Sequence, residues 1–284
     1  SIPPNTIATF VDVNTMTLSV PYPGATAIIS VEFIRATATS AFVVSIQPDI
    51  FTENPLTIDP YISVSGVDET LSIVQPVLPT QTLFTLSHDA NINTLFIKNV
   101  SAGIGILVDS NQPTQLTPNA NVNSCTFENC DICIKGTSST SRGEMLVSDC
   151  TFRGIYSKGI FIDGRTLTTV NTIRGNYRDT YFEVSANNTN CLYIEGPNSE
   201  VIIQGMTIDG NGFTGCNGIY ITDGSYLGLD STQIDDINGN GLYIPNIGLG
   251  PALTVSGISF RDIVGNDINI LHPGTTGVVS AIAQ

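Results

Sequence analysis

Two sets of acidic side chains in this chain have types and spacing that suit work on glycosidic bonds. Asp209 and Asp235 are 26 residues apart and each follows an apolar strand-like run. Asp163 and Glu195 follow a second series of such runs, and Lys135 ends the run before them. Two carboxylates hydrolyse a glycosidic bond when they lie about 5 Å apart (retention) or about 6.5–9.5 Å apart (inversion). A lysine beside carboxylates suits β-elimination instead. These five residues are the candidate catalytic groups.

A structural role competes with catalysis at the same positions. Aligning the apolar runs places Asp209 and Asp235 in one series of charged positions, which reads Glu128, Arg153, Asp209, Asp235 and Arg261. Opposite charges alternate at both ends of that series. Such ladders on a solvated face contribute under about 1 kcal/mol per pair. We therefore expect a ladder more than a catalytic centre, although two neighbouring carboxylates could raise one pKa.

Three tyrosines form the candidate binding surface. Tyr193, Tyr220 and Tyr243 each stand between two apolar residues of a short run, so their rings should point outward on neighbouring strands. An outward ladder could pack against a sugar, a partner chain or a sister subunit. It could also do no more than stabilise the sheet through ring stacking. The chain has no Trp, which argues against a deep carbohydrate groove.

The elements that must position these residues repeat about every 26 residues. Segments such as Val147–Arg153, Ile203–Asp209, Leu229–Asp235 and Val255–Arg261 align, and Val122–Glu128 fits the same frame. The aligned apolar positions are Phe127, Phe152, Ile208, Ile234 and Phe260. The 56 residues between Phe152 and Ile208 leave room for one longer turn. A period of this size predicts a solenoid whose repeats gain a core only by stacking.

Each repeat has a second strand-like half. Gly159–Ile162, Cys191–Ile194, Gly218–Ile221, Gly241–Ile244 and Asp267–Ile270 alternate apolar and other residues, and Gly, Asn, Asp and Ser separate the runs. No run has helical periodicity. Two or three short strands per repeat predict an all-β fold, a right-handed parallel β-helix.

These repeats resemble the pectin-lyase-like superfamily of parallel β-helices, over roughly residues 90 to 284. The character is closest to viral tailspike or fibre proteins, and the resemblance implies the fold more than an activity. Polygalacturonases in this superfamily carry Asn-Thr-Asp, Asp-Asp, Gly-His-Gly and Arg-Ile-Lys motifs in successive turns. Asp235-Asp236 is present, but Gly-His-Gly and Arg-Ile-Lys are absent from the sequence. We therefore expect no pectinase-type turnover.

The two ends of the chain differ from the repeats. Residues 1–75 read as a β-rich cap or small module, with strands expected over Ile7–Val20, Thr26–Arg35 and Ala41–Gln47. Residues 76–284 form the expected β-helix, with regular rungs from near residue 90. Val279 and Ile282 begin another rung just before Gln284, so we expect more chain beyond it or a subunit contact over this end.

Charge and cysteine content exclude several classes of function. A net charge of −15, with ten Lys and Arg, disfavours nucleic acid and anionic membranes. No apolar run is long enough to insert into a membrane. Cys125 and Cys150 align as core thiols, whereas Cys191 and Cys216 could pair. Cys130 and Cys133 lack a second ligand pair, so no metal and no cofactor is expected. His88 and His272, the only histidines, fit surface turns.

The sequence thus favours a structural or attachment component of a surface appendage, such as a viral fibre, tailspike-like or capsid-decorating protein. Its expected place is the virion or an extracellular surface, and its expected partners are other subunits, as a homotrimer, and surface polysaccharide. A polysaccharide hydrolase or lyase is the alternative, and a bacterial surface adhesin is a third hypothesis. Whether the chain is an enzyme stays open, with the balance against it.

Overall fold

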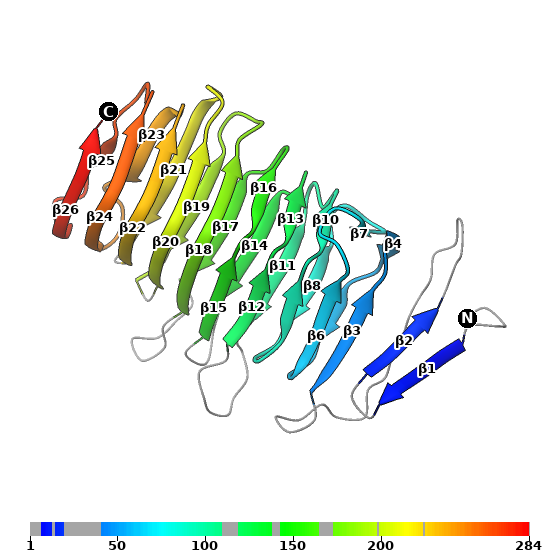
Figure 1. Cartoon of the computed structure of the whole chain (residues 1–284). Helices are drawn as coiled ribbons and strands as arrows, with labels where there is room; N and C mark the ends of the chain where they lie inside the picture. The colour runs from blue at the N-terminus through cyan, green and yellow to red at the C-terminus, as the bar shows by residue number, and fades with distance from the viewer. Residues whose placement is uncertain are drawn as a thin grey trace.

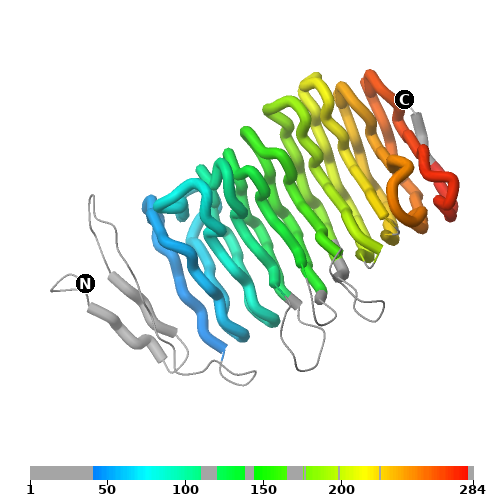
Figure 2. The backbone as a smooth tube through the Cα atoms, turned by 180° about the vertical axis from the view of Figure 1, so that it is seen from behind, coloured from blue at the N-terminus to red at the C-terminus, as the bar shows by residue number. Residues whose placement is uncertain are grey.

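Parallel strands stack along one axis and make the chain a right-handed parallel β-helix in the computed structural model. The structure describes residues 7–12, 15–19, 41–109, 119–137, 143–164, 173–197, 199–223 and 225–283. Figure 1 shows the strands side by side from one end of the molecule to the other. Figure 2 shows the same succession of turns from behind. The fold predicted from the repeat is confirmed.

Two sheets form the walls of the helix. Among the described residues, the large sheet has 17 strands: β1 (Ile7–Asp12), β2 (Thr15–Ser19), β3 (Phe42–Ile46), β4 (Asp49–Glu53), β6 (Ile62–Gly66), β7 (Ser72–Pro76), β9 (Asn91–Asn93), β10 (Phe96–Lys98), β12 (Asn119–Asn123), β13 (Thr126–Glu128), β15 (Gly143–Ser148), β16 (Thr151–Arg153), β18 (Ile173–Glu183), β20 (Ser199–Asp209), β22 (Tyr226–Asp235), β24 (Ala252–Arg261) and β26 (Thr276–Ala283). The small sheet has nine: β5 (Leu56–Ile58), β8 (Thr82–Leu86), β11 (Ile104–Asp109), β14 (Ile132–Thr137), β17 (Lys158–Asp163), β19 (Asn190–Glu195), β21 (Thr214–Thr222), β23 (Asn238–Ile244) and β25 (Ile268–Ile270).

A single residue bends each rung within the large sheet. It lies between two strands, as between β12 and β13, or inside one long strand, as in β18. Its backbone is left-handed, with φ between 48° and 75°, at Thr94, Ser124, Asp149, Asp179, Gly205, Ser231 and Gly257. Asp, Ser and Gly tolerate or favour turn conformations of this kind. The bend keeps the ladder intact, because the amide of Ser124 donates to the Ser148 carbonyl on the next rung.

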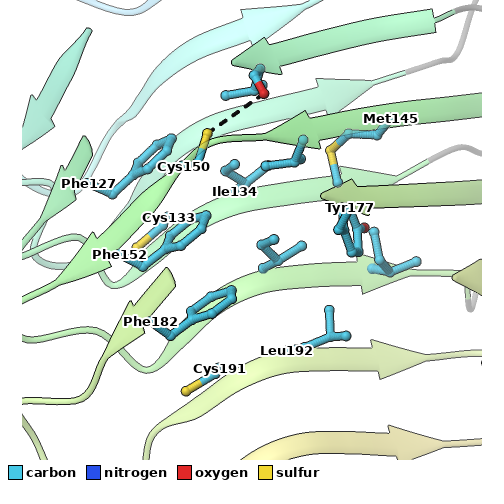
Figure 3. Close-up of a cluster of buried hydrophobic side chains, with 14 of the residues drawn as sticks. Phe127, Cys133, Ile134, Met145, Cys150, Phe152, Tyr177, Phe182, Cys191 and Leu192 are labelled. Atoms are coloured by element: carbon cyan, nitrogen blue, oxygen red, sulfur yellow. Dashed lines mark hydrogen bonds between the residues drawn. The ribbon is translucent and has the colours of Figure 1, made fainter. Parts of the chain in front are cut away.

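The column of apolar residues predicted from the repeat lies inside the helix. Phe127, Phe152, Ile208, Ile234 and Phe260 are at most 1% exposed, and strand register places them on successive rungs. Phe182 of β18 fills the long gap between Phe152 and Ile208. Ring centroids lie 5.1 Å apart for Phe127 and Phe152, and 4.4 Å apart for Phe152 and Phe182, in parallel stacks. Figure 3 shows these three rings one above another.

The cysteines belong to the same core. All six are free and buried, which confirms the expectation for Cys125 and Cys150, and the alternative of a Cys191–Cys216 disulfide is not formed. The Cys150 thiol lies 3.7 Å from the Val122 carbonyl oxygen of the previous rung. Burial raises the pKa of the Cys150 and Cys191 thiols well above the usual range. These thiols are therefore packing groups and not nucleophiles.

The parallel rungs begin earlier than the sequence indicated. Phe42 of β3 pairs with Ile62 of β6, and Val64 of β6 pairs with Ile92 of β9, so regular stacking precedes residue 90. Residue 75, the expected end of the N-terminal region, lies inside β7, which pairs with both β4 and β10. The first rungs have steps of 20 and 28 residues, read from those pairs, and these unequal steps hide the repeat.

The N-terminal strands continue from this first rung. β1 and β2 pair antiparallel, and β2 then joins β3 in parallel. They fall within the strand expected over Ile7–Val20, and β3 falls within Ala41–Gln47. The strand expected over Thr26–Arg35 lies outside the described residues.

Candidate functional site

Four aromatic rings form a continuous column on the outer face of the small sheet. Register places Phe161 beside Tyr193, Tyr193 beside Tyr220, and Tyr220 beside Tyr243. Their ring centroids are 5.2, 4.9 and 5.2 Å apart; Tyr193 and Tyr220 stack in parallel and the other two contacts are edge-on. We call these four residues the aromatic ladder. The structure therefore brings the three predicted tyrosines together and adds Phe161.

Two lysines lie over one end of the aromatic ladder. The Lys135 ammonium is 4.9 Å from the Phe161 ring centroid, and the Lys158 ammonium is 5.1 Å from it. Lys158 also lies 4.9 Å from the Tyr193 ring centroid. A cation over an aromatic face gains about 0.5–2 kcal/mol, depending on desolvation. The whole chain has only ten Lys and Arg, so two lysines at one ring are a notable concentration of cations.

A row of asparagines runs beside the tyrosines. Asn190, Asn217 and Asn240 each stand three residues before a ladder tyrosine. The Asn217 amide donates to Asn190 Oδ1 at 2.9 Å, and the Asn240 amide donates to Asn217 Oδ1 at 3.1 Å. Asn269, which is in register with Tyr243, donates to Asn240 Oδ1 at 3.0 Å. These bonds tie the strands together and give the aromatic ladder a polar border.

The second acidic pair borders the other side of the aromatic ladder. Asp163 and Glu195 are neighbours in register, as the sequence predicted. The placement of Lys135 in their column was wrong, because Thr137 pairs with Asp163 while Lys135 pairs with Phe161. The strand alternation puts Lys135 two residues earlier, in the aromatic column. Its ammonium nevertheless reaches Asp163 Oδ2 at 3.0 Å. Lys135, Asp163 and Glu195 therefore lie together on this face.

The other acidic pair lies on the large sheet, after the bend. The charged column predicted there includes two ion pairs: Arg153 Nε to Glu128 Oε2 at 2.9 Å, and Arg261 Nη2 to Asp235 Oδ2 at 2.7 Å. Asp209 and Asp235 are neighbours in register. The structure adds Glu183, which pairs with Asp209 and was hidden in the long gap of the repeat.

The contacts of Asp235 favour a structural role. The residue is 8% exposed, and its Oδ2 accepts hydrogen bonds from both Arg261 and Gln233. Its Oδ1 is buried without a hydrogen-bond partner among the described residues. A carboxylate whose oxygens are paired or enclosed is poorly placed to reach a substrate. The catalytic roles of Asp209 and Asp235 stay predictions, and the geometry favours the ladder.

One tyrosine stands beside this column. Tyr181 of β18 is 36% exposed, and burial, followed by the negative charges of Asp209 and Glu183, raises the pKa of its phenol. Tyr220 on the small sheet has its pKa raised by burial, then by Tyr243 and Glu195. The pKa of each phenol is therefore raised in part by carboxylates on its own face of the helix.

Other candidate chemistry is not assembled in the part of the chain that the structure describes. Within those residues no group of three or more His, Cys, Asp and Glu side chains could hold a metal. His272 lies in an exposed turn, with Nε2 3.0 Å from the Gly248 carbonyl oxygen. The described residues include no helix suited to crossing a bilayer.

Sequence reasoning missed Phe161, Lys158 and the asparagine row. A signal for them exists, because Asn190-Cys-Leu-Tyr193, Asn217-Gly-Ile-Tyr220 and Asn240-Gly-Leu-Tyr243 repeat one four-residue pattern. Lys158-Gly-Ile-Phe161 is the same pattern with Lys and Phe. The pattern alone marks one face of four neighbouring strands.

Comparison with known proteins shows the fold. No family model and no curated protein matches this chain. Among solved structures, a PL6 family alginate lyase, AlyGC, aligns with a TM-score of 0.58 and 13% identity over 86% of this chain and 36% of the lyase. ORF18 of Geobacillus virus E2 aligns with a TM-score of 0.49 and 10% identity, covering 89% of this chain and 56% of that one. The catalytic unit of a GH87 α-1,3-glucanase from Streptomyces thermodiastaticus aligns at 0.38, with 15% identity and coverage of 79% and 51%.

Of these three, only the alginate lyase superposes closely enough to show a shared fold. At 13% identity the likeness is to the parallel β-helix alone. The chain spans about a third of the length of that lyase.

Proposed function

We propose that this protein is an attachment protein that binds a polysaccharide along the aromatic ladder, at a virion or extracellular surface. The observation that carries the proposal is the run of partly exposed Tyr193, Tyr220 and Tyr243 on one face, with centroid spacings of 4.9 and 5.2 Å. Phe161, which is 5% exposed beneath the two lysines, supports the end of this run. Aromatic faces pack against the apolar faces of sugars, while phenol hydroxyls hydrogen-bond to sugar hydroxyls.

The borders of the aromatic ladder suit a polar, chain-like ligand. Asparagines line one side, and Asp163 and Glu195 line the other. A ligand running along the solenoid axis would meet the same groups on each rung. Repetition of the site along the axis matches repetition of sugar units along a polysaccharide, so several weak contacts add to one stable attachment.

The test is binding to an array of immobilised polysaccharides. We expect Tyr220→Ala or Tyr243→Ala to weaken binding at least about tenfold, or ~1.4 kcal/mol. Tyr226→Ala is the matched control, because Tyr226 is 36% exposed on the large sheet. Equal loss in the ladder and control variants, or no binding by the unaltered protein, would refute the proposal.

The same surface could instead hold a sister subunit, as the expected homotrimer would require. Sedimentation separates the two occupants. If the protein is a trimer that Tyr220→Ala dissociates, the aromatic ladder is a subunit contact. If Tyr220→Ala changes glycan binding but not the sedimentation coefficient, the ladder faces the glycan.

A polysaccharide hydrolase or lyase is the second candidate, and one observation favours it. Lys135, Asp163 and Glu195 lie together at the edge of the aromatic ladder, where a bound sugar would pass. The alginate lyase of the same fold is, by its name, active on a polysaccharide. Against this, Lys135 already donates to Asp163. Release of reducing ends or unsaturated products, abolished by Asp163→Asn or Glu195→Gln, would establish the enzyme.

A further inference from the structure

A hollow of about 440 Å³ opens at the corner where the large sheet turns into the small sheet. Its lining comes from four successive turns and includes Ser101, Asn129, Asp131, Ile155 and Asn187. The turn between β16 and β17 has four residues, 154–157, whereas the turn between β18 and β19 has six, 184–189. The longer turn stands out beside the shorter one and leaves the space between them.

We propose that this hollow holds a single neutral sugar unit that branches from the polysaccharide on the aromatic ladder. The inference rests on the proposed function, because the aromatic ladder binds the main chain of the same polysaccharide. The volume falls within the range of about 300–1,000 Å³ that is usual for small-ligand sites.

Position relative to the aromatic ladder supports a branch and not a separate ligand. Ser157 in the lining directly precedes Lys158, whose ammonium lies over Phe161 and Tyr193. Phe161 is three positions after Lys158, which is roughly 10 Å along a strand at about 3.3 Å per residue. The hollow therefore lies at the start of the strand that carries Phe161, next to the end of the aromatic ladder.

The lining offers hydrogen-bond donors that are already oriented. Asn129 Oδ1 accepts the Ile155 amide at 3.0 Å, and Asn187 Oδ1 accepts the Thr214 amide at 2.9 Å. Each side chain is thereby fixed with its amide nitrogen free of an acceptor among the described residues. The Ser101 hydroxyl and the Asp131 carboxylate add a donor and an acceptor. Fixed donors and acceptors together suit a ring that carries several hydroxyls.

The remaining lining indicates which sugars fit. Ile155 is 64% exposed and provides an apolar surface for the face of a pyranose ring. The lining contains no Lys or Arg, and its one charged side chain is acidic. An anionic substituent would gain no partner there, so the branch is neutral.

The experiment is calorimetric titration with paired oligosaccharides, linear and singly branched, on glucan, mannan and galactan backbones of equal length. We expect the unaltered protein to bind a branched member at least about tenfold tighter than its linear partner. Ser101→Trp fills the hollow and should equalise the two without weakening the linear one. Thr254→Trp, on the outer face of the large sheet, is the control and should keep the preference. Asp131→Ala should reduce the preference without adding bulk.

Each outcome assigns a failure to one proposal. If the unaltered protein does not prefer the branched ligand, or Ser101→Trp and Asp131→Ala both keep the preference, the branch site is wrong and the ladder stands. If Tyr220→Ala leaves linear binding unchanged, the ladder is wrong. If no oligosaccharide binds, both proposals are wrong.

Discussion

The two outer faces of the β-helix each hold an aromatic ring beneath two cations, but different side chains continue the column of that ring on the following rungs. On the small sheet, Phe161 lies beneath Lys135 and Lys158, and the rings continue as Tyr193, Tyr220 and Tyr243. On the large sheet, Phe96 lies beneath Lys98 at 5.9 Å and Arg153 at 5.1 Å. Its column continues as Thr126 and Thr151 before it reaches Tyr181, so no ring lies on either of the next two rungs.

The difference distinguishes a face that can bind a ligand, on the small sheet, from a face whose side chains stabilise the helix, on the large sheet. On the large sheet, Glu128 pairs with Arg153 and Asp235 pairs with Arg261 between neighbouring rungs. On the small sheet the rings stack on one another from rung to rung, and Tyr193, Tyr220 and Tyr243 stay partly exposed. A solenoid gives every face the same strand spacing, so the side chains alone decide which face binds.

The largest expected effect is a loss of stability from a substitution in the core that both sheets share. Phe182→Ala removes a fully buried ring stacked 4.4 Å from Phe152, and should lower the free energy of unfolding by about 3–5 kcal/mol. Tyr181→Ala, one residue away and 36% exposed, should change it by less than about 0.5 kcal/mol. Urea denaturation measures both. Similar losses in the two variants would mean that β18 does not alternate as described.

The next effect lies within the charged column. Arg261→Ala leaves Asp235 with one enclosed oxygen and no cation, so we expect a loss of about 1–3 kcal/mol. Arg153→Ala frees a Glu128 side chain that is 32% exposed, and should cost less than about 1 kcal/mol. Denaturation midpoints compare the two. An equal or reversed order would contradict the structural role of Asp235.

A pH effect is expected at the first rung of the large sheet. Burial raises the pKa of Glu53 to about 7 from 4.5. The folded state therefore holds this proton more tightly, and the contribution of Glu53 to stability falls as pH rises from about 4.5 to about 7. Because the side chain is only half-buried, the change should be about 1 kcal/mol or less. Thermal unfolding at pH values of about 4.5 and about 7 should show that Glu53→Gln loses less stability with rising pH than the unaltered protein does. A parallel decline in the two would contradict it.

The smallest expected effect is a change in the pKa of one tyrosine phenol on each face. Tyr181 and Tyr220 both have a raised phenol pKa, but from different carboxylates. Asp209→Asn should lower the pKa of Tyr181 and leave Tyr220 unchanged, while Glu195→Gln should do the reverse. Nuclear magnetic resonance of ring-labelled tyrosine follows both titrations. Crossed or absent responses would mean that these carboxylates do not act on the phenols of their own faces.

The repeat and the residues that it buries can be read from the spacing of apolar residues along the chain. Residues at 26-residue steps, such as Ile208, Ile234 and Phe260, must share a face, and alternation within a strand decides whether that face is inward. The outward tyrosines followed from the same rule, as did the Glu128–Arg153 and Asp235–Arg261 pairs. Local spacing fixes neighbours whenever consecutive rungs have equal length.

Contacts between columns, and between rungs of unequal length, cannot be read from this spacing and depend on the folded chain. Phe182 was hidden because its rung is 30 residues from Phe152 instead of 25 or 26. Lys135 stands in the aromatic column yet reaches Asp163 diagonally, through a flexible side chain that no register predicts. The hollow beside the ladder is lined by four turns, and the last two, 154–157 and 184–189, differ in length. Side-chain reach and turn shape depend on packing in three dimensions, which a one-dimensional repeat does not encode.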